Sequence, residues 1–297
     1  MSTRPLDGQV AIVTGGGKGL GRAFALDLAA RGAAVVVNNR NRVVDADGRS
    51  AADYVVAEIE AAGGTAVADY GAVEEPETAT RLVRTALENW GRLDICITSA
   101  GISNPQMFHS TTPENFAQVI GVNVTGTALV ASAALKVMRE ARAGRILLVA
   151  STAGLHGEPT VSAYAASKGA VIALGRTVAV EGARRGVLTN VLLPYATTQM
   201  TEAGMDPRFA EVMTSESVAP LATALVDPRS EVNGQVVVAG AGGFRVADSV
   251  ELGTVRLPGG PIEPDVLAKL LAESRAGDPH TYPEAQAAFQ GFAADLA

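Results

Sequence analysis

Short apolar runs rich in β-branched residues alternate along this chain with longer segments whose apolar residues recur at helical spacing. The runs that predict strands are residues 10–14, 34–38, 65–68, 93–98, 145–150, 187–193 and 234–240. Most are apolar at consecutive positions, as in parallel strands that are buried on both faces. The alternation predicts right-handed crossovers, so we expect an α/β fold with a single doubly wound parallel sheet of the Rossmann-like type.

A Pro- and Gly-rich segment, residues 258–264, interrupts this alternation. We therefore expect one domain over residues 1–257 and a C-terminal helical extension over residues 258–297. In the extension, apolar residues share one face of two short helices, Val266, Leu267, Leu270 and Leu271 in the first and Phe289, Phe292 and Leu296 in the second. Such amphipathic helices are expected to dock on the main domain or on a partner subunit.

Two expected helices carry more apolar residues than one buried face needs. The first, residues 113–139, begins after the capping signal of Thr112 and Pro113, and the second covers residues 161–185. Helices of this kind are expected to bury surface in a homodimer or a homotetramer.

The composition argues against several classes of protein. The net charge is −7 over 297 residues and no run of Lys or Arg occurs, so a nucleic-acid or membrane partner has no support. The one cysteine, Cys96, cannot form an internal disulfide, and the three histidines show no metal-ligand spacing, so we expect no metal site. No apolar run reaches the length of a membrane span, the start is polar, and the ending ADLA is not a peroxisomal address. A cytoplasmic location is the expectation.

The stretch TGGGKGLGRA, residues 14–23, follows the first strand and opens a helix. Its glycines allow a sharp turn, and the helix N-terminus can meet a pyrophosphate, so residues 1–257 are expected to bind a dinucleotide. The spacing is G-x-x-x-G-x-G and differs from the general G-x-G-x-x-G pattern; a purely structural turn is the alternative. The expected contacts are Gly15, Lys18, Gly19, Leu20 and Gly21.

The second strand ends in Asn39 and Arg40, where many dinucleotide folds have an acidic residue for the ribose 2′-hydroxyl of NAD. An Arg fork suits a 2′-phosphate, and Lys18 adds a second positive charge. We therefore predict that NADP(H) is preferred and NAD(H) is possible. The alternative is that Arg40 and Arg42 are solvated residues of a loop insertion.

Tyr164 and Lys168 lie four residues apart in an expected helix and therefore share one of its faces. Ser151 ends a strand thirteen residues before Tyr164, and Asn123 lies in the preceding helix. Ligands of open α/β sheets bind at the carboxyl edge, where Ser151 is expected. The alternative for Tyr164 is an ordinary packing role.

This set of motifs resembles the short-chain dehydrogenase/reductases, whose signature is T-G-x-x-x-G-x-G followed by Asn, Ser and Y-x-x-x-K. The resemblance implies that Tyr164 is the general acid and base, that Ser151 binds the substrate oxygen and that Lys168 holds the nicotinamide ribose. It also implies that Asn123 holds a water that links Lys168 to solvent. Lowering the pKa of a Tyr from about 10 to about 7 takes about 4 kcal/mol, which the charges of Lys168 and of the nicotinamide can supply.

Nearly the whole chain is also similar to the (3R)-hydroxyacyl-CoA dehydrogenase part of the type-two multifunctional β-oxidation enzymes. Three positions depart from that pattern: Asn39 replaces an acidic residue, residues 98–101 read TSAG for N-N-A-G, and Tyr195 follows Pro194 where Gly is usual. The resemblance places further cofactor contacts at Ala100, Gly101, Pro194 and Thr197 (or Thr198), with Asp69 as a candidate for the adenine edge.

The expected activity is hydride transfer between NADP(H) or NAD(H) and a small-molecule secondary alcohol or ketone, with a 3-hydroxyacyl or 3-oxoacyl thioester as the first candidate. Met200, Met205 and Met213 suit an adaptable apolar pocket for an acyl chain or a steroid, or they are ordinary packing residues. A steroid, a polyketide or another carbonyl compound is therefore an alternative substrate. A non-catalytic dinucleotide-binding regulator is the alternative from another class.

Overall fold

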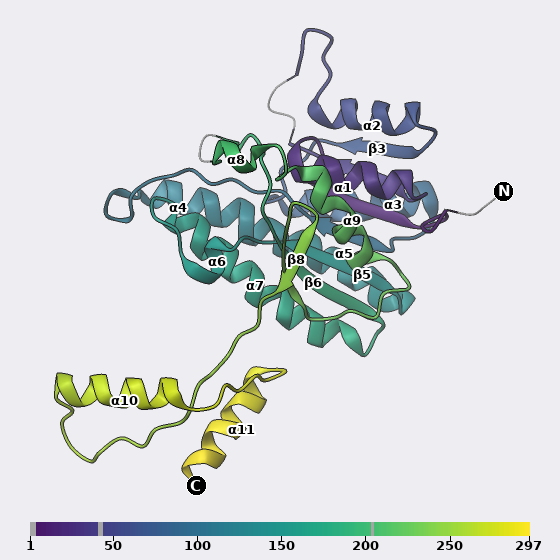
Figure 1. Cartoon of the computed structure of the whole chain (residues 1–297). Coiled ribbons are helices and arrows are strands. Elements are labelled where there is room, and N and C mark those ends of the chain that lie inside the picture. Colours follow the sequence, from purple (N-terminus) through teal and green to yellow (C-terminus); the bar gives the residue numbers. More distant parts are fainter. Residues whose placement is uncertain (1–3, 41–43, 203–204) are drawn as a thin grey trace. The chain divides into compact units, whose positions relative to one another are not determined.

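The computed structural model describes residues 4–40, 44–202 and 205–297. The chain forms two compact units, of which the first extends to Val246 and the second is Ala247–Ala297 (Figure 1). The Pro- and Gly-rich segment 258–264 lies within the second unit.

The first unit is built on one eight-stranded sheet with the order β3-β2-β1-β4-β5-β6-β7-β8. The strands are β1 (Val10–Thr14), β2 (Ala34–Asn38), β3 (Thr65–Asp69), β4 (Ile95–Thr98), β5 (Gly144–Val149), β6 (Val187–Pro194), β7 (Val236–Gly240) and β8 (Gly243–Val246). Strands β1 to β7 are parallel, and β8 pairs antiparallel with β7 at the edge. The expected α/β fold is confirmed, whereas β8 was not predicted.

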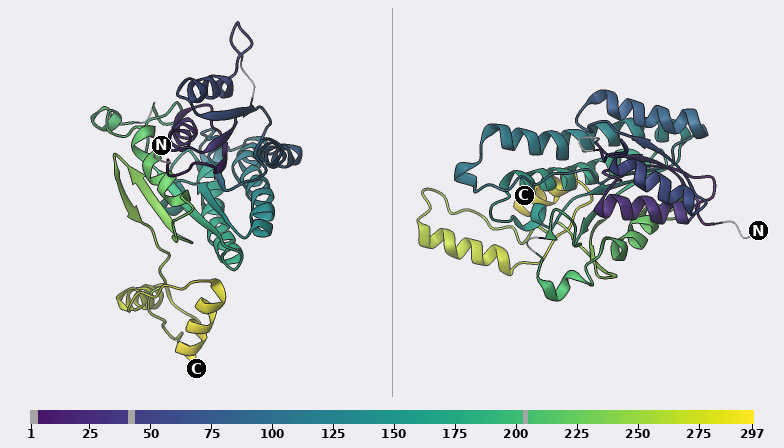
Figure 2. Two further views of the ribbon diagram at one scale, coloured as in Figure 1. Left: turned by 90° about the vertical axis from the view of Figure 1, so that its right-hand side faces the viewer. Right: turned by 90° about the horizontal axis from the view of Figure 1, so that it is seen from above.

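Helices cover both faces of the sheet (Figure 2). Helix α1 (Gly19–Ala30) packs against α2 (Ala51–Ala61) and α9 (Ser215–Val226). The second layer contains α3 (Pro76–Trp90), α5 (Thr127–Ala141) and α7 (Ser162–Ala183), packed side by side. Short helices among the described residues lie in the connections: η1 (Phe108–Ser110), α6 (Ala153–His156) and α8 (Pro207–Ala210).

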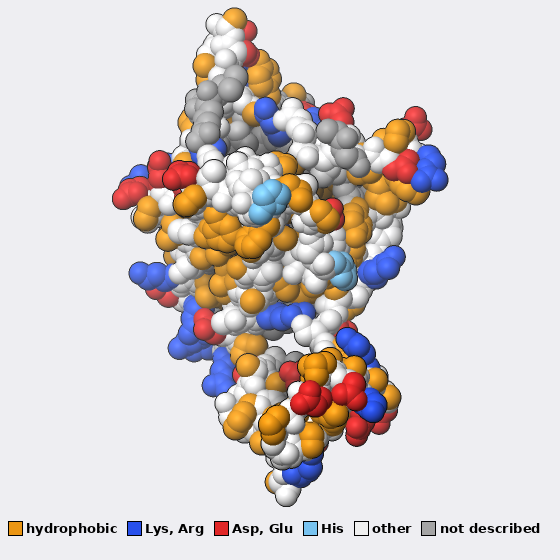
Figure 3. Space-filling model, turned by 90° about the vertical axis from the view of Figure 1, so that its left-hand side faces the viewer, with side chains coloured by type: hydrophobic (Ala, Val, Ile, Leu, Met, Phe, Trp, Pro, Cys, Tyr) orange, Lys and Arg blue, Asp and Glu red, His pale blue; other side chains and the backbone are white. Residues whose placement is uncertain are grey.

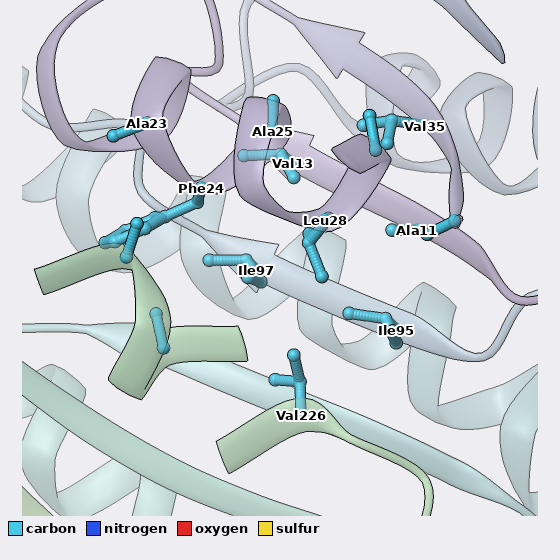
Figure 4. Packing of buried hydrophobic residues seen from close by; sticks show 14 of the residues in the cluster. Ala11, Val13, Ala23, Phe24, Ala25, Leu28, Val35, Ile95, Ile97 and Val226 are labelled. Carbon is cyan, nitrogen blue, oxygen red and sulfur yellow. The ribbon is translucent and has the colours of Figure 1, made fainter. Parts of the chain in front are cut away.

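The core under α1 and α9 fixes the position of the glycine-rich turn. Phe24 and Leu28 of α1 are fully buried against strand residues that include Val13 and Ile97, and Val226 of α9 closes the cluster (Figure 4). Burying a side chain of this size contributes about 1.5–3 kcal/mol. Because α1 is anchored along its length, the turn before it has a fixed place at the carboxyl end of β1.

The long helix predicted over 113–139 consists of α4 (Pro113–Ile120), the π-helical turn η2 (Gly121–Gly126) and α5. Among the described residues, this helix, 113–141, is long and apolar enough to cross a membrane, with a mean hydropathy of 1.5. The expectation that no segment is long and apolar enough was therefore wrong by this criterion. It rested on unbroken apolar runs, and small and polar residues interrupt the apolar residues of this helix. The helix packs against β4, β5, α3 and α7, and 44% of its apolar stretch is buried.

The second unit contains α10 (Pro264–Ala276) and α11 (Ala285–Leu296). A bridge between Glu251 and His280 and a hydrogen bond from Thr254 Oγ1 to Asp295 hold it together. None of residues 247–297, all of which the structure describes, is buried, and apolar side chains spread over its surface (Figure 3). Such exposed apolar side chains are typical of helices that dock on another surface, and the docking itself stays a prediction.

Candidate active site

A cavity of about 510 Å³ opens at the carboxyl ends of the parallel strands. It lies beside the point where the strand order reverses between β1 and β4, which is where ligands bind in open α/β sheets. The glycine-rich turn, the segment after β4, the end of β5, helix α7 and the segment after β6 all contribute to its wall. These segments contain most of the residues that the sequence singles out.

The glycine-rich turn forms one end of the cavity. Gly15 has a φ of +65°, and a Cβ atom there would lie 2.8 Å from the backbone N of Ala100. A Cβ atom on Gly21 would overlap the carbonyl oxygen of Gly15. Lys18, Gly19 and the two residues that follow line the cavity, so the first turn of α1 faces it. Backbone N–H groups at a helix N-terminus suit a pyrophosphate, and the turn therefore fits a dinucleotide.

Replacing Gly21 with Ala is expected to weaken dinucleotide binding by at least about tenfold, because its methyl group must displace the Gly15 backbone. Titration of the chain with NADPH, followed by fluorescence, measures the change. The matched control is Gly259→Ala, since that position has open space and no positive φ. Equal affinities for Gly21→Ala and the unaltered chain would contradict this assignment of the turn.

Beyond the turn, Asn39 lines the cavity, whereas Arg40 and Asp69 are not among its lining residues. Asp69 is buried and accepts hydrogen bonds from Asn38 Nδ2 at 2.8 Å and from Arg81 Nε at 2.6 Å. Burial alone would raise the pKa of the Asp69 carboxyl, but these bonds and one from the Gly71 N–H outweigh it and lower the pKa. Asp69 thus ties β2 and β3 to α3. Arg42, the other Arg of the expected insertion, lies outside the described residues.

Three of the four expected catalytic residues, Ser151, Tyr164 and Lys168, line the same cavity. Ser151 follows β5, and its side chain lies near enough to the Tyr164 hydroxyl to lower the pKa of that group. The Lys168 Nζ lies 5.5 Å from the centre of the Tyr164 ring and donates to the Val149 carbonyl at 2.9 Å. The helical spacing of Tyr164 and Lys168 therefore places both beside the end of β5.

The pKa values of this pair differ from the sequence expectation. Burial raises the pKa of Tyr164, and the nearby Ser151 side chain offsets only part of that effect. Burial likewise lowers the pKa of Lys168 to about 8. The chain's own residues therefore keep the Tyr164 phenol protonated at neutral pH, the state that a general acid requires.

Asn123 lies in η2, is fully buried and is not among the residues that line the cavity. Its Nδ2 donates to the Ile102 carbonyl and to Ser167 Oγ, both at 2.9 Å, and its Oδ1 accepts from the Ile102 N–H at 2.9 Å. The side chain thus clamps the segment after β4 to α7, one residue before Lys168. The water that Asn123 is expected to hold for Lys168 stays a prediction.

A close backbone contact sets the distance between Ser151 and the helix of Tyr164 and Lys168. A Cβ atom on Gly154 would lie 2.5 Å from the Gly169 N and 2.6 Å from the Lys168 carbonyl carbon. Only glycine at position 154 allows α6, which follows Ser151, to approach α7 this closely.

The segment after β6 forms the opposite wall. Pro194 and Thr198 line the cavity, whereas Thr197 is held outside by bonds to the Met213 and Ala210 carbonyls. The side chain of Thr198 lies over the turn, 3.3 Å from where a Cβ on Gly19 would be. The sequence analysis missed several lining residues that flank its motifs, Ser103, Thr152, Ala153, Glu158, Val161, Gln199 and Thr201. The one signal in the sequence that could have pointed to these residues is their position next to the motifs.

A doubly wound sheet, a glycine-rich turn at a helix N-terminus and a Ser-Tyr-Lys group in one cavity define the class of dinucleotide-dependent oxidoreductases that act on a CH–OH group. The profile of the family described as "short chain dehydrogenase" matches residues 9–208. The chain belongs to this family.

Two relatives and one solved structure illustrate the similarity. Peroxisomal multifunctional enzyme type 2 of Mus musculus is 37% identical over 286 residues, which are 94% of this chain and 38% of the relative. The 3-oxoacyl-[acyl-carrier-protein] reductase of Synechocystis sp. is 40% identical over 66% of this chain and 78% of its own length. A crystal structure of a short chain dehydrogenase from Mycobacterium avium is 37% identical, with a TM-score of 0.81 over 93% of this chain and 99% of that one. The chain spans about two fifths of the multifunctional relative.

Proposed function

We propose that this oxidoreductase interconverts 3-hydroxyacyl and 3-oxoacyl thioesters, using NADP(H) in preference to NAD(H). The observation that carries the proposal is the placement of Ser151, Tyr164 and Lys168 in the cavity that the glycine-rich turn also lines. A bound nicotinamide dinucleotide supplies or accepts the hydride. The residues that would hold it are Gly15, Lys18, Leu20, Asn39 and Ala100.

Tyr164 carries the proton chemistry of this proposal. Its hydroxyl donates a proton to the ketone oxygen during reduction and removes it from the alcohol during oxidation. Ser151, which lines the same cavity as Tyr164, would bind the same substrate oxygen. A charged Lys168 favours the phenolate over the phenol, because the ammonium lies 5.5 Å from the ring.

The wall after β6 supports an acyl substrate. Tyr195, Met200 and Met205 line the cavity, and the flexible thioethers can adapt to chains of different length. Met213 does not line it. The similar Synechocystis protein is named for a 3-oxoacyl substrate, which agrees in chemical class.

An assembly of several copies is part of the proposal. Val180 on α7 is 49% exposed and Phe116 on α4 is 37% exposed, so the adjoining helices present apolar surface. A homodimer or a homotetramer would bury these side chains. Sedimentation at micromolar concentration distinguishes these states from a monomer.

The test is oxidation of NADPH and of NADH with acetoacetyl-CoA and longer 3-oxoacyl-CoA compounds, followed by absorbance. We expect turnover with both cofactors, and faster turnover with NADPH than with NADH when the cofactor concentration is low. Tyr164→Phe is expected to lose this turnover. Turnover of other ketones but not of thioesters would overturn the substrate assignment. Cofactor binding without turnover of any carbonyl compound would instead favour a non-catalytic regulator.

A further inference from the structure

Arg40, just after β2, forms an ion pair with Glu74 that has no role in the proposed binding of the cofactor. Arg40 Nη1 lies 3.0 Å from Glu74 Oε1, and the two side chains are 27% and 29% exposed. Arg40 directly follows Asn39, which lines the cavity, and Glu74 lies in the connection between β3 and α3. The pair is shielded enough that bulk water and salt screen it only in part.

Of the other charged side chains that the structure describes near this end of β2, Asp69 is paired and Lys18 is not. Asp69 is neutralised by Arg81, which donates to both of its carboxylate oxygens. Lys18 lines the cavity, is exposed and forms no ion pair with any residue in the described part of the chain. Among the described residues, a 2′-phosphate at the end of β2 would therefore meet one uncompensated cation, Lys18, and one cation already paired with a carboxylate, Arg40.

We propose that Glu74 is a specificity residue that limits the preference for 2′-phosphorylated cofactors by competing with the 2′-phosphate for Arg40. A phosphate that reaches Arg40 must share it with the Glu74 carboxylate or displace that carboxylate, and either event costs binding free energy. The ribose 2′-hydroxyl of NAD(H) is uncharged and does not incur this cost. This inference rests on the proposed use of NADP(H) and NAD(H), and it names the residue that sets their ratio.

The test uses calorimetric titration of the full chain with 2′,5′-ADP and with 5′-AMP, two fragments that differ only in the 2′-phosphate. In Glu74→Gln, which keeps the shape and removes the charge, we expect the Kd for 2′,5′-ADP to fall about fivefold and the Kd for 5′-AMP to stay unchanged. Glu75→Gln is the matched control, because Glu75 is adjacent and exposed and forms no ion pair with Arg40.

The proposal also requires that the effect act through Arg40. Glu74→Gln made in an Arg40→Ala background is therefore expected to give no gain in 2′,5′-ADP affinity. An equal gain with and without Arg40 would overturn the proposal in favour of simple repulsion by Glu74. An unchanged ratio of the two Kd values in the single variant would also overturn it.

Failure of the proposed function gives a different result. If the unaltered chain binds 5′-AMP more tightly than 2′,5′-ADP, the preference for NADP(H) is wrong, while a fivefold gain in Glu74→Gln would still support the role of Glu74. If neither fragment binds any variant, both the adenine site and the inference fail.

Discussion

Tyr164→Phe is expected to lower kcat by about a thousandfold, because the substitution removes the hydroxyl that exchanges a proton with the substrate oxygen. The ring remains, so Lys168 keeps its place over it and the affinity for the cofactor should change by less than about twofold. Steady-state turnover gives kcat, and fluorescence titration with NADPH gives the affinity.

Tyr195→Phe is the matched control for this experiment. Tyr195 also lines the cavity and is 47% exposed, so its hydroxyl is not expected to transfer the proton. An equal loss of kcat in both variants, or none in Tyr164→Phe, would show that another group carries the proton.

Lys168→Met is expected to abolish most activity and at the same time to stabilise the chain. Burial lowers the pKa of Lys168 to about 8, compared with about 10.5 for a free lysine, and the difference corresponds to about 3 kcal/mol. At pH 7 the folded chain must hold the ammonium in a buried place, where its hydrogen-bond partner among the described residues is the Val149 carbonyl. Methionine fills a similar volume without the charge, so the free energy of unfolding should rise by up to about 3 kcal/mol.

The stabilisation by Lys168→Met is expected to decrease as the pH rises. Between pH 8 and about 10.5 the unfolded chain binds more protons at this lysine than the folded chain, so its contribution to the free energy of unfolding rises with pH. The advantage of Lys168→Met is therefore largest below pH 8 and disappears toward pH 10.5. Urea unfolding of both proteins at pH 7 and pH 10 measures it, with the exposed Lys136 changed to Met as control. A destabilised Lys168→Met protein at pH 7 would contradict the argument.

Much of the fold was predictable because a buried parallel strand leaves a strong local signal. The apolar runs at residues 10–14 and 34–38 match β1 and β2 without a shift. Strand β8 could not be predicted, because all four of its residues are exposed and an edge strand needs no continuous apolar run.

In the site, too, features set by one segment could be predicted from the sequence, whereas features set by distant segments could not. The spacing of Tyr164 and Lys168 is a property of one helix, so the sequence predicts that they lie together. The pKa of Tyr164 depends on burial by several segments, which raises it and which the effect of Ser151 offsets only in part. The pairing of Arg40 with Glu74 joins residues 34 positions apart and has no local signal.

The π-helical turn η2 limits which changes in chain length the helix 113–141 tolerates. Such a turn is equivalent to one extra residue inserted into an α-helix, which rotates the two flanking segments by roughly 100° relative to each other. Helices α4 and α5 therefore keep separate buried faces, and Asn123 occupies the turn between them. Deleting one residue here would restore a regular helix while turning Asn123 away from Ile102 and Ser167. At this point the length of the chain is as constrained as the identity of its residues.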